Sequence, residues 1–434
     1  MLFVYTPKIT PRLGYIFRHI FFRMLDIKIK MTSSIEEFVS HNGPKISYSD
    51  KPLGNELFFY RSKILVDTGI QDISPELFNW KGHVVFFKVP ENSTLPFDVF
   101  GASFYLISRY EEYLPHIKDS TGRFMFKNSL AHQNMFLELP LVDIWISELK
   151  IIINKRFNDL STKMHLKKPF LPILSVPQQF KFLNKSIISS IFQSLQSIYR
   201  LDIKLLLRQV LVLAKIKKDP YDQYDFIISF FKKNHIDFLT FFKYSNKSYN
   251  IGSVSLLNKN YKLLIKNFSD HNFVGHLVSY FGQLDSIVLK KENRNLQDLI
   301  HRIPNKIMLN NGIISLSKIY NDLINNEIFE DYSMCYNDKI GFRASTSVPF
   351  YFYDLVNESQ TKLKIFPIVS TEESIRKESS SQVFSKLDRI FSFLPLENSI
   401  FSIVFTAGIF NKYQENKNLR SSFLKFIIKH GKVR

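Results

Sequence analysis

The chain lacks several features by which many classes of protein are recognised. It has one cysteine, Cys335, and so cannot form an internal disulfide, which is typical of a protein from a reducing compartment. Without a second cysteine it has neither a zinc ribbon nor a CxxC redox site. It has only 14 glycines and no glycine-rich loop for phosphates or dinucleotides. We interpret Cys335 as a small core residue at the end of a strand.

Long apolar runs are also missing. No stretch approaches the roughly 18 uninterrupted apolar residues of a transmembrane helix. The first residues carry Arg12, Arg18, His19 and Arg23 where a signal peptide requires an apolar core. We therefore expect a cytoplasmic protein with neither a signal peptide nor a membrane-spanning segment.

The N-terminal segment is instead predicted to form an amphipathic helix. Its apolar residues follow the i, i+3, i+4, i+7 spacing and are Leu13, Ile16, Phe17, Ile20, Phe21, Met24 and Leu25. Most such faces pack on their own domain. The alternative is that this basic helix makes peripheral contact with an anionic membrane surface.

Acidic residues are scarce relative to basic ones. The chain has 58 Lys and Arg against 39 Asp and Glu, a net charge of +19 that favours anionic partners. The basic residues are spread along the chain, without the run of five or six that marks a nucleic-acid arm. We expect no specific nucleic-acid binding, and a composition bias toward Lys, Asn, Ile and Phe explains the charge equally well.

What the chain does have is apolar material for large cores, with 45% hydrophobic residues and 43 Phe. Residues 1–165 are predicted to form an α/β accessory domain. It contains a helix capped by Ser34, strands near 42–49 and 83–89, and helices over 95–116 and from Pro140 onward. The polar and basic stretch 158–169 is the predicted linker.

Residues 168–434 alternate between short apolar strands and amphipathic helices. The predicted strands are 170–176, 236–242, 273–278, 305–309, 328–334, 363–369 and 400–405. Such alternation indicates a parallel sheet, because parallel neighbours need helical crossovers. The predicted fold class is therefore α/β, and the number of strands is compatible with closure into a barrel. Residues 184–216 are predicted to form a longer helical insertion after the first strand.

The segment 329–355 is the most suggestive of function. Asp331 lies in a predicted strand and Arg343 in the loop after it, at what would be the ligand-binding end of the sheet. The two side chains either bind substrate, orienting a base or a sugar hydroxyl, or pair with each other as a structural bridge. These alternatives stay open.

Three other groups of polar residues are candidates for chemistry. Asp270, His271 and His276 lie within seven residues and are weak candidates for a metal site, although His271 precedes a strand and His276 lies inside it. Asp219 precedes Pro220 and is predicted to open a helix, a better interpretation of "KDPYDQYDF" than a charged catalytic loop. Adjacent residues on a helix point about 100° apart, so Glu111 and Glu112 form no acid/base pair.

Several long motifs resemble a bacterial family of two-domain polysaccharide deacetylase-like proteins. They are "GPKISYSDKPLGNELFF", "LPFDVFGASFYLISRYEEYLPHIKDSTGRF", "NSLAHQNMFLEL", "KDPYDQYDF" and "EDYSMCYNDKIGFRASTSVPFYFYDL". The resemblance implies an accessory domain followed by a distorted (β/α)7 barrel of the NodB-homology, carbohydrate-esterase type. Active members bind zinc or a similar ion through an aspartate and histidines, with a second aspartate as base.

The chain departs from this family at the metal ligands. Ser175 and Pro177 stand where the first-strand motif has two aspartates. Leu277 stands at the histidine of the next motif, with His276 one residue early, and a shift of one residue turns a strand side chain to the opposite face. Met308 and Asn310 stand where an Arg/His motif is expected, while Asp331 and Arg343 match the family.

These departures lead to three hypotheses. The first is a catalytically degenerate pseudoenzyme of cell-surface polysaccharide metabolism, with a polysaccharide or a surface-glycan biosynthesis protein as partner and no cofactor. The second is an active deacetylase whose divalent metal, such as zinc, is held by relocated ligands. The third is a basic protein that binds nucleic acid or a membrane surface.

Overall fold

The structure is a computed structural model of the chain. It describes residues 1–158, 160, 170–183, 190–191, 194–195, 198–199, 201–245, 256, 258–378, 382–396, 398–413 and 416–431. The predicted linker at 158–169 and the predicted domain boundary at 165–168 lie almost wholly outside these residues.

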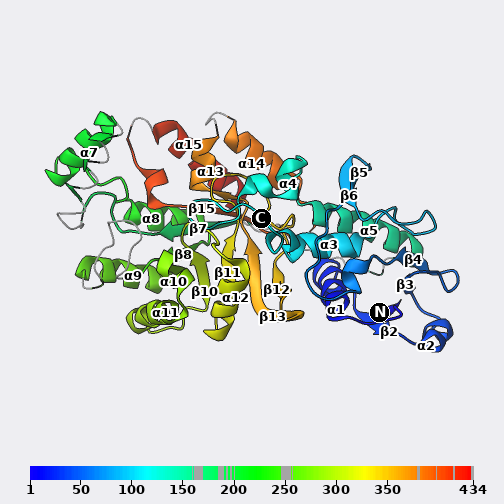
Figure 1. The fold of residues 1–434 in the computed structure, drawn as a ribbon. Coiled ribbons are helices and arrows are strands. Elements are labelled where there is room, and N and C mark those ends of the chain that lie inside the picture. Colours follow the sequence, from blue (N-terminus) through cyan, green and yellow to red (C-terminus); the bar gives the residue numbers. More distant parts are fainter. Residues whose placement is uncertain are drawn as a thin grey trace.

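The N-terminal part, residues 1–158, is built on a small parallel sheet with the strand order β2-β1-β3-β4 (Figure 1). Its strands are β1 (Leu2–Tyr5), β2 (Ile29–Thr32), β3 (Lys45–Ser49) and β4 (Leu57–Tyr60), and a separate antiparallel hairpin joins β5 (Leu77–Trp80) to β6 (His83–Phe86). The helices are α1 (Pro11–Phe17), η1 (Arg18–Met24), α2 (Ile35–Ser40), η2 (Lys63–Leu65), α3 (Val99–Ile107), η3 (Tyr110–Glu112), η4 (Phe126–Asn128), α4 (Leu130–Gln133) and α5 (Leu141–Phe157). The Ser34 side chain caps α2 by accepting from the backbone N–H of Glu37, as predicted.

The amphipathic N-terminal segment packs on its own protein. Leu13, Phe17 and Phe21 are fully buried. The Tyr15 hydroxyl donates to the carbonyl of Tyr351, 2.7 Å away in the C-terminal part. The apolar face of this segment is therefore part of the protein's own core.

The C-terminal part contains a nine-stranded sheet within the described residues, in the order β12-β13-β11-β10-β9-β8-β7-β15-β14. The strands are β7 (Phe170–Val176), β8 (Leu239–Phe242), β9 (Phe273–Val278), β10 (Lys306–Leu309), β11 (Glu330–Met334), β12 (Phe350–Asp354), β13 (Ser359–Pro367), β14 (Ser370–Thr371) and β15 (Phe401–Phe405). Neighbouring strands are parallel, except that β12 pairs with β13 in the antiparallel sense.

The two ends of this sheet are joined by one continuous stretch of chain. Within 359–371, residues 364–367 pair with β11, and residues 370–371 pair with β15. Between them, the Ile368 N–H donates to Met334 and the Val369 N–H donates to Ser402, at 3.1 and 3.0 Å. The sheet therefore curls round on itself, and the predicted α/β fold with a barrel-like C-terminal sheet is confirmed.

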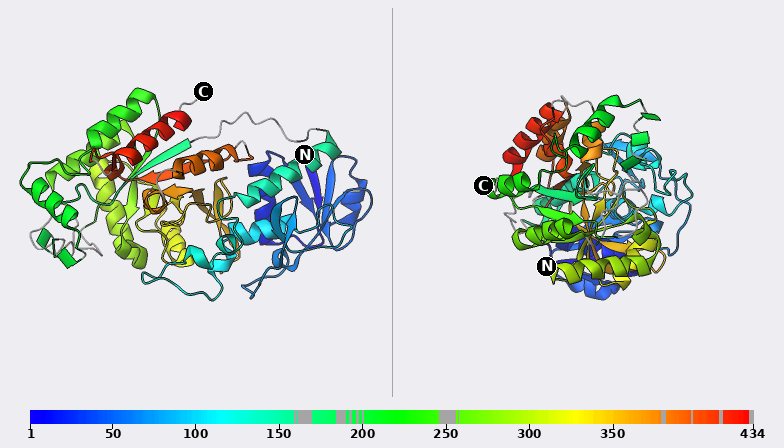
Figure 2. Two further views of the ribbon diagram at one scale, coloured as in Figure 1. Left: turned by 90° about the horizontal axis from the view of Figure 1, so that it is seen from above. Right: turned by 90° about the vertical axis from the view of Figure 1, so that its left-hand side faces the viewer.

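Helices surround the barrel (Figures 1 and 2). They are α7 (Ile203–Leu213), α8 (Tyr224–Asn234), α9 (Lys259–His271), α10 (Tyr280–Leu284), α11 (Ser286–Ile300), α12 (Leu316–Asn325), α13 (Glu372–Lys377), α14 (Val383–Ser392), η5 (Ala407–Phe410) and α15 (Lys417–Gly431). Among the helices that the structure describes, none has both the length and the apolar character needed to cross a bilayer.

Asp219 does not open a helix, contrary to the sequence prediction. Helix α8 begins at Tyr224, and Asp219 is buried beside the loop that follows β7. Its carboxylate accepts the backbone N–H groups of Lys181, Phe182 and Leu183 at 2.9, 2.8 and 3.2 Å. The N–H of Tyr221 is a fourth donor at 2.9 Å. Asp219 therefore fixes the path of the chain where β7 ends.

We expect Asp219→Ala to lower the free energy of unfolding by about 2–3 kcal/mol. The substitution leaves backbone donors without their charged acceptor. Chemical denaturation of the full chain measures the effect. Asp222→Ala, three residues away at an exposed position, is the matched control and should change the free energy by less than about 0.5 kcal/mol. Equal effects of the two substitutions would contradict this role of Asp219.

Candidate functional site

The interior of the barrel is filled by apolar side chains. One cluster contains one residue from each of β7 to β11 and from β15, together with Cys335 and with Ile368 between β13 and β14, and its members are Ile173, Phe241, Leu277, Met308, Tyr332, Cys335, Ile368 and Val404. Gly275 makes room for this packing, since a Cβ atom there would lie 2.4 Å from the Phe241 ring. The lumen at this level is a packed core.

The five positions at which the family resemblance implies metal-binding or catalytic residues lie on or just beyond this interior face. Leu277 and Met308 are members of the apolar cluster. Ser175 is two residues beyond Ile173 and so shares its face of β7, and Pro177 and Asn310 follow the ends of their strands. A hydroxyl, a thioether, an amide and two hydrocarbon side chains do not suit zinc, which is held in proteins by carboxylates, imidazoles and thiolates. The residues present therefore do not fit the metal that the family resemblance implies.

The relocated metal candidates do not converge. Asp270 and His271 are exposed at the end of α9, whereas His276 is fully buried in β9. The His276 Nε2 atom lies 3.4 Å from a carboxylate oxygen of Glu292 on α11. Because Leu277 points inward, its neighbour His276 points outward to the helices. Among the described residues, no three His, Cys, Asp or Glu side chains are grouped as metal ligands would be.

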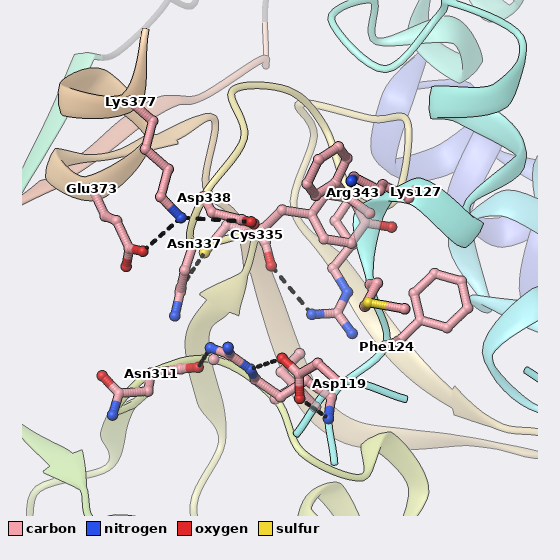
Figure 3. A pocket seen from close by; sticks show the side chains of 16 residues that line it. Asp119, Phe124, Lys127, Asn311, Cys335, Asn337, Asp338, Arg343, Glu373 and Lys377 are labelled. Atoms are coloured by element: carbon pink, nitrogen blue, oxygen red, sulfur yellow. Dashed lines mark hydrogen bonds and ion pairs between the residues drawn. The ribbon is translucent and has the colours of Figure 1, made fainter. Parts of the chain in front are cut away.

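A pocket opens beside this core, at the carboxyl ends of β10 and β11. It has a volume of about 270 Å³ (Figure 3). The barrel contributes Asn311, Gly312, Ile313, Cys335, Tyr336, Asn337, Asp338, Arg343, Glu373 and Lys377, and the N-terminal part contributes Asp119, Arg123, Phe124, Met125, Phe126 and Lys127. The carboxyl ends of parallel strands are where α/β barrels bind their ligands. The pocket is the candidate site.

Ion pairs fix several charged side chains around the pocket. Arg123 pairs with Asp119 at 2.7 Å and donates to the carbonyl of Asn311 at 2.6 Å, which ties the 119–127 loop to the barrel. On the other side, Lys377 lies 3.0 Å from Glu373 and 3.7 Å from Asp338 (Figure 3). The pocket thus combines aromatic rings and amide groups with charged side chains, several of which are held by ion pairs.

Arg343 lines the pocket but is held by the N-terminal part. Its guanidinium forms two hydrogen bonds with Glu112, at 2.9 and 2.7 Å. Arg109 pairs with both Glu111 and Glu112 at 2.8 Å. Burial opposes ionisation of Glu112, but the two guanidinium groups outweigh it and lower its pKa to about 2. This ion network, consisting of Arg109, Glu111, Glu112 and Arg343, joins the two parts of the protein.

Residues 341–347 of the segment 329–355 also serve this junction. Gly341 has φ +144°, and a Cβ atom there would lie 2.5 Å from the carbonyl oxygen of Leu137. The Asp143 carboxylate, in the first turn of α5, accepts from the N–H of Ser347 at 2.8 Å and from the Thr346 hydroxyl at 2.5 Å. Burial raises the pKa of Asp143 to about 6. Residues 341–347 are therefore wedged against the N-terminal part.

Asp331 lies apart from the pocket. It is fully buried and accepts a hydrogen bond of 2.7 Å from the Tyr320 hydroxyl on α12. Burial raises its pKa to about 6. Because Tyr332 points into the barrel, Asp331 points outward to the helix layer. The structure therefore places Arg343 in the lining of the candidate site, whereas Asp331 contacts the helix layer and does not line the pocket.

Two further sequence interpretations concern Cys335 and the pocket loop. Cys335 is a buried core residue, as predicted, and burial raises its pKa to about 12, so that it stays a thiol.

The sequence analysis did not identify the 119–127 loop as part of a functional site. Its sequence signal was the "DSTGR" turn, in which the Asp119 carboxylate accepts from the N–H groups of Thr121 and Arg123, both at 2.9 Å.

Comparison with known proteins gives limited matches. A model of a family of unknown function, DUF7033, matches residues 2–158, less than half of the chain. No curated protein matches the sequence significantly.

Solved structures with a similar arrangement are distant. A CE4 family pseudoenzyme from Bacillus anthracis has 9% identity and a TM-score of 0.32, and the match covers 62% of this chain and 63% of that chain, less than two thirds of its length. A protein from Mycobacterium smegmatis provisionally assigned as a polysaccharide deacetylase has 6% identity, a TM-score of 0.37 and coverages of 62% and 85%. The allantoinase PuuE has 11% identity and a TM-score of 0.39, and the match covers 61% of this chain and 85% of that chain.

Proposed function

We propose that this protein is a polysaccharide deacetylase-like barrel that has lost its metal centre and acts in cell-surface polysaccharide metabolism by binding a glycan. The observation that carries the proposal is the apolar layer inside the barrel. Leu277 and Met308 occupy, as parts of a packed core, positions where the family resemblance implies polar or charged residues. A deacetylase needs a metal to polarise the acetyl carbonyl and to activate water.

The pocket at the carboxyl ends of β10 and β11 supports binding without catalysis. A sugar presents hydroxyl and acetamido groups on an otherwise apolar ring. Phe124, Phe126 and Tyr336 offer aromatic surface, and Asn337 and Lys127 offer hydrogen-bond donors. Ligand sites in proteins typically combine such apolar walls with a few polar groups that fix orientation.

We expect the Lys127→Ala/Asn337→Ala double variant to bind an oligomer of N-acetylglucosamine at least about fivefold more weakly than the wild type. It removes donors from the pocket wall, and each lost hydrogen bond costs about 0.5–1.5 kcal/mol. Isothermal titration calorimetry on the full chain measures the change. The control variant His132→Ala/Lys339→Ala alters a different cavity, of about 540 Å³, and should bind like the wild type.

Three outcomes would count against this proposal. Hydrolysis of the acetyl groups by the zinc-loaded wild type would show an active deacetylase with relocated ligands. If neither the wild type nor the control bound the oligomer, this glycan class would be excluded. Equal weakening in both double variants would place the binding site outside the pocket.

A further inference from the structure

We propose that helix α7 docks the protein onto an anionic lipid bilayer. The helix lies at the end of the molecule remote from the N-terminal part (Figures 1 and 2). One exposed side of the helix is apolar, with Ile203 66% exposed, Leu207 57% and Val210 55%. These residues have the i, i+4, i+7 spacing of one helix face. A helix that serves only its own protein turns its polar side outward.

The neighbouring described residues repeat the pattern. Ile191, Leu195 and Ile198 have the same spacing, and each is more than half exposed. The two stretches are in contact, since the Gln209 side chain donates to the carbonyl of Ser190 at 3.0 Å. Ten of the 27 large apolar side chains that are exposed among the described residues lie between 191 and 216. This concentration makes a patch of the kind that marks an interaction surface.

The inward side of α7 shows which way the helix faces. Val212 and Gln209 are each 1% exposed, whereas Ile203, Leu207 and Val210 lie on the opposite side of the helix. The helix is therefore anchored to the protein by one side and presents a second apolar side to its surroundings.

The charges around this face indicate which partner covers it. Between 203 and 218 there are five basic residues and no acidic one. Lys204, Lys215, Lys217 and Lys218 are exposed, and the Arg208 guanidinium lies 4.5 Å from the centre of the Tyr413 ring. An apolar helix face flanked by Lys and Arg is the pattern of a helix that lies in the interface of an anionic membrane. A second copy of this chain would bring like charges together across a two-fold axis.

The test is flotation of the full chain with lipid vesicles. We expect binding to phosphatidylcholine vesicles that contain about 30% phosphatidylglycerol and little binding to phosphatidylcholine alone. Binding should fall between about 50 and 500 mM salt, because the salt screens the lysines. The Leu207→Glu/Val210→Glu variant should partition at least about tenfold more weakly.

Ile287→Glu/Ile303→Glu is the matched control. It adds the same two charges at apolar positions that are 79% and 68% exposed elsewhere on the barrel, and it should bind vesicles like the wild type. Absence of binding to the anionic vesicles at low salt would overturn the proposal, as would an equal loss in both variants. Light scattering tests whether a second copy of the chain covers this face instead. If the wild type self-associates and Leu207→Glu/Val210→Glu abolishes the self-association, the face belongs to a second copy and the proposal fails. Binding of a glycan at the pocket is independent of all these outcomes.

Discussion

Glu112→Gln should lower the free energy of unfolding by about 3–5 kcal/mol at neutral pH. Glu112 is the acceptor shared by Arg109 and Arg343, and all three side chains are at most 4% exposed. The neutral amide keeps the shape of the carboxylate but leaves buried guanidinium groups with only Glu111 to balance them. Chemical denaturation of the full chain measures the loss. This ion network is one of the contacts that join the two parts of the protein.

The difference in the free energy of unfolding between the wild type and Glu112→Gln should depend on pH, and this dependence tests whether the difference is electrostatic. The folded-state pKa of Glu112 is about 2, below the ordinary value of 4.5. A depressed pKa contributes stability that is complete above pH 4.5 and is lost as the pH falls toward 2. The difference in the free energy of unfolding between the wild type and Glu112→Gln should therefore become smaller as the pH falls from 4.5 toward 2, because a protonated Glu112 resembles the amide. A gap that stays constant would contradict the assignment.

The control for this prediction is the exposed pair of Arg61 and Asp50. Their contact is also 2.7 Å long, but the Asp50 side chain is 55% exposed. Solvent and salt screen such a pair, so Asp50→Asn should change the free energy of unfolding by less than about 1 kcal/mol. A loss as large as that of Glu112→Gln would mean that burial does not explain the difference.

Leu277→Ala should lower the free energy of unfolding by about 2–5 kcal/mol. Leu277 is 1% exposed and packs with Phe241, Met308 and Tyr332 inside the barrel. The substitution removes buried methyl groups and leaves a cavity that the surrounding strands cannot close. Leu277→Met, which nearly conserves volume, should cost less than about 1.5 kcal/mol.

Ile287→Ala is the control for burial, since that residue is 79% exposed on α11, and its effect should stay within about 0.5 kcal/mol. If Leu277→Ala proved as mild as the control, the interior layer would not be a packed core. The case that hydrophobic packing has replaced a metal centre would then lose its structural basis.

Much of the barrel could be predicted because its strands are short apolar runs between helices. The runs at 170–176 and 273–278 coincide with β7 and β9, and the other five overlap β8, β10, β11, β13 and β15. Closure could not be predicted, since it depends on how 359–371 changes partners from β11 to β15. Strands β1 and β2 were missed, because four residues each carry too little periodicity.

The candidate site was only partly predictable, because its residues are distant in sequence. Arg343 was identified from its motif, but its partner Glu112 is 231 residues away. The pocket loop around Asp119 meets Asn311 and Glu373 only through the packing of the N-terminal part on the barrel. For the same reason, Asp219 was taken for a helix residue, although its partners are backbone groups of 181–183.

The most direct test of the central claim is the zinc content of the purified protein after dialysis against excess zinc and removal of free metal, by elemental analysis. A barrel that has Ser175, Pro177, Leu277, Met308 and Asn310 at the positions of the family's metal-site motifs should retain far less than one zinc per chain. Retention of roughly one zinc per chain would contradict the claim. It would mean that the metal centre has been rebuilt from other residues.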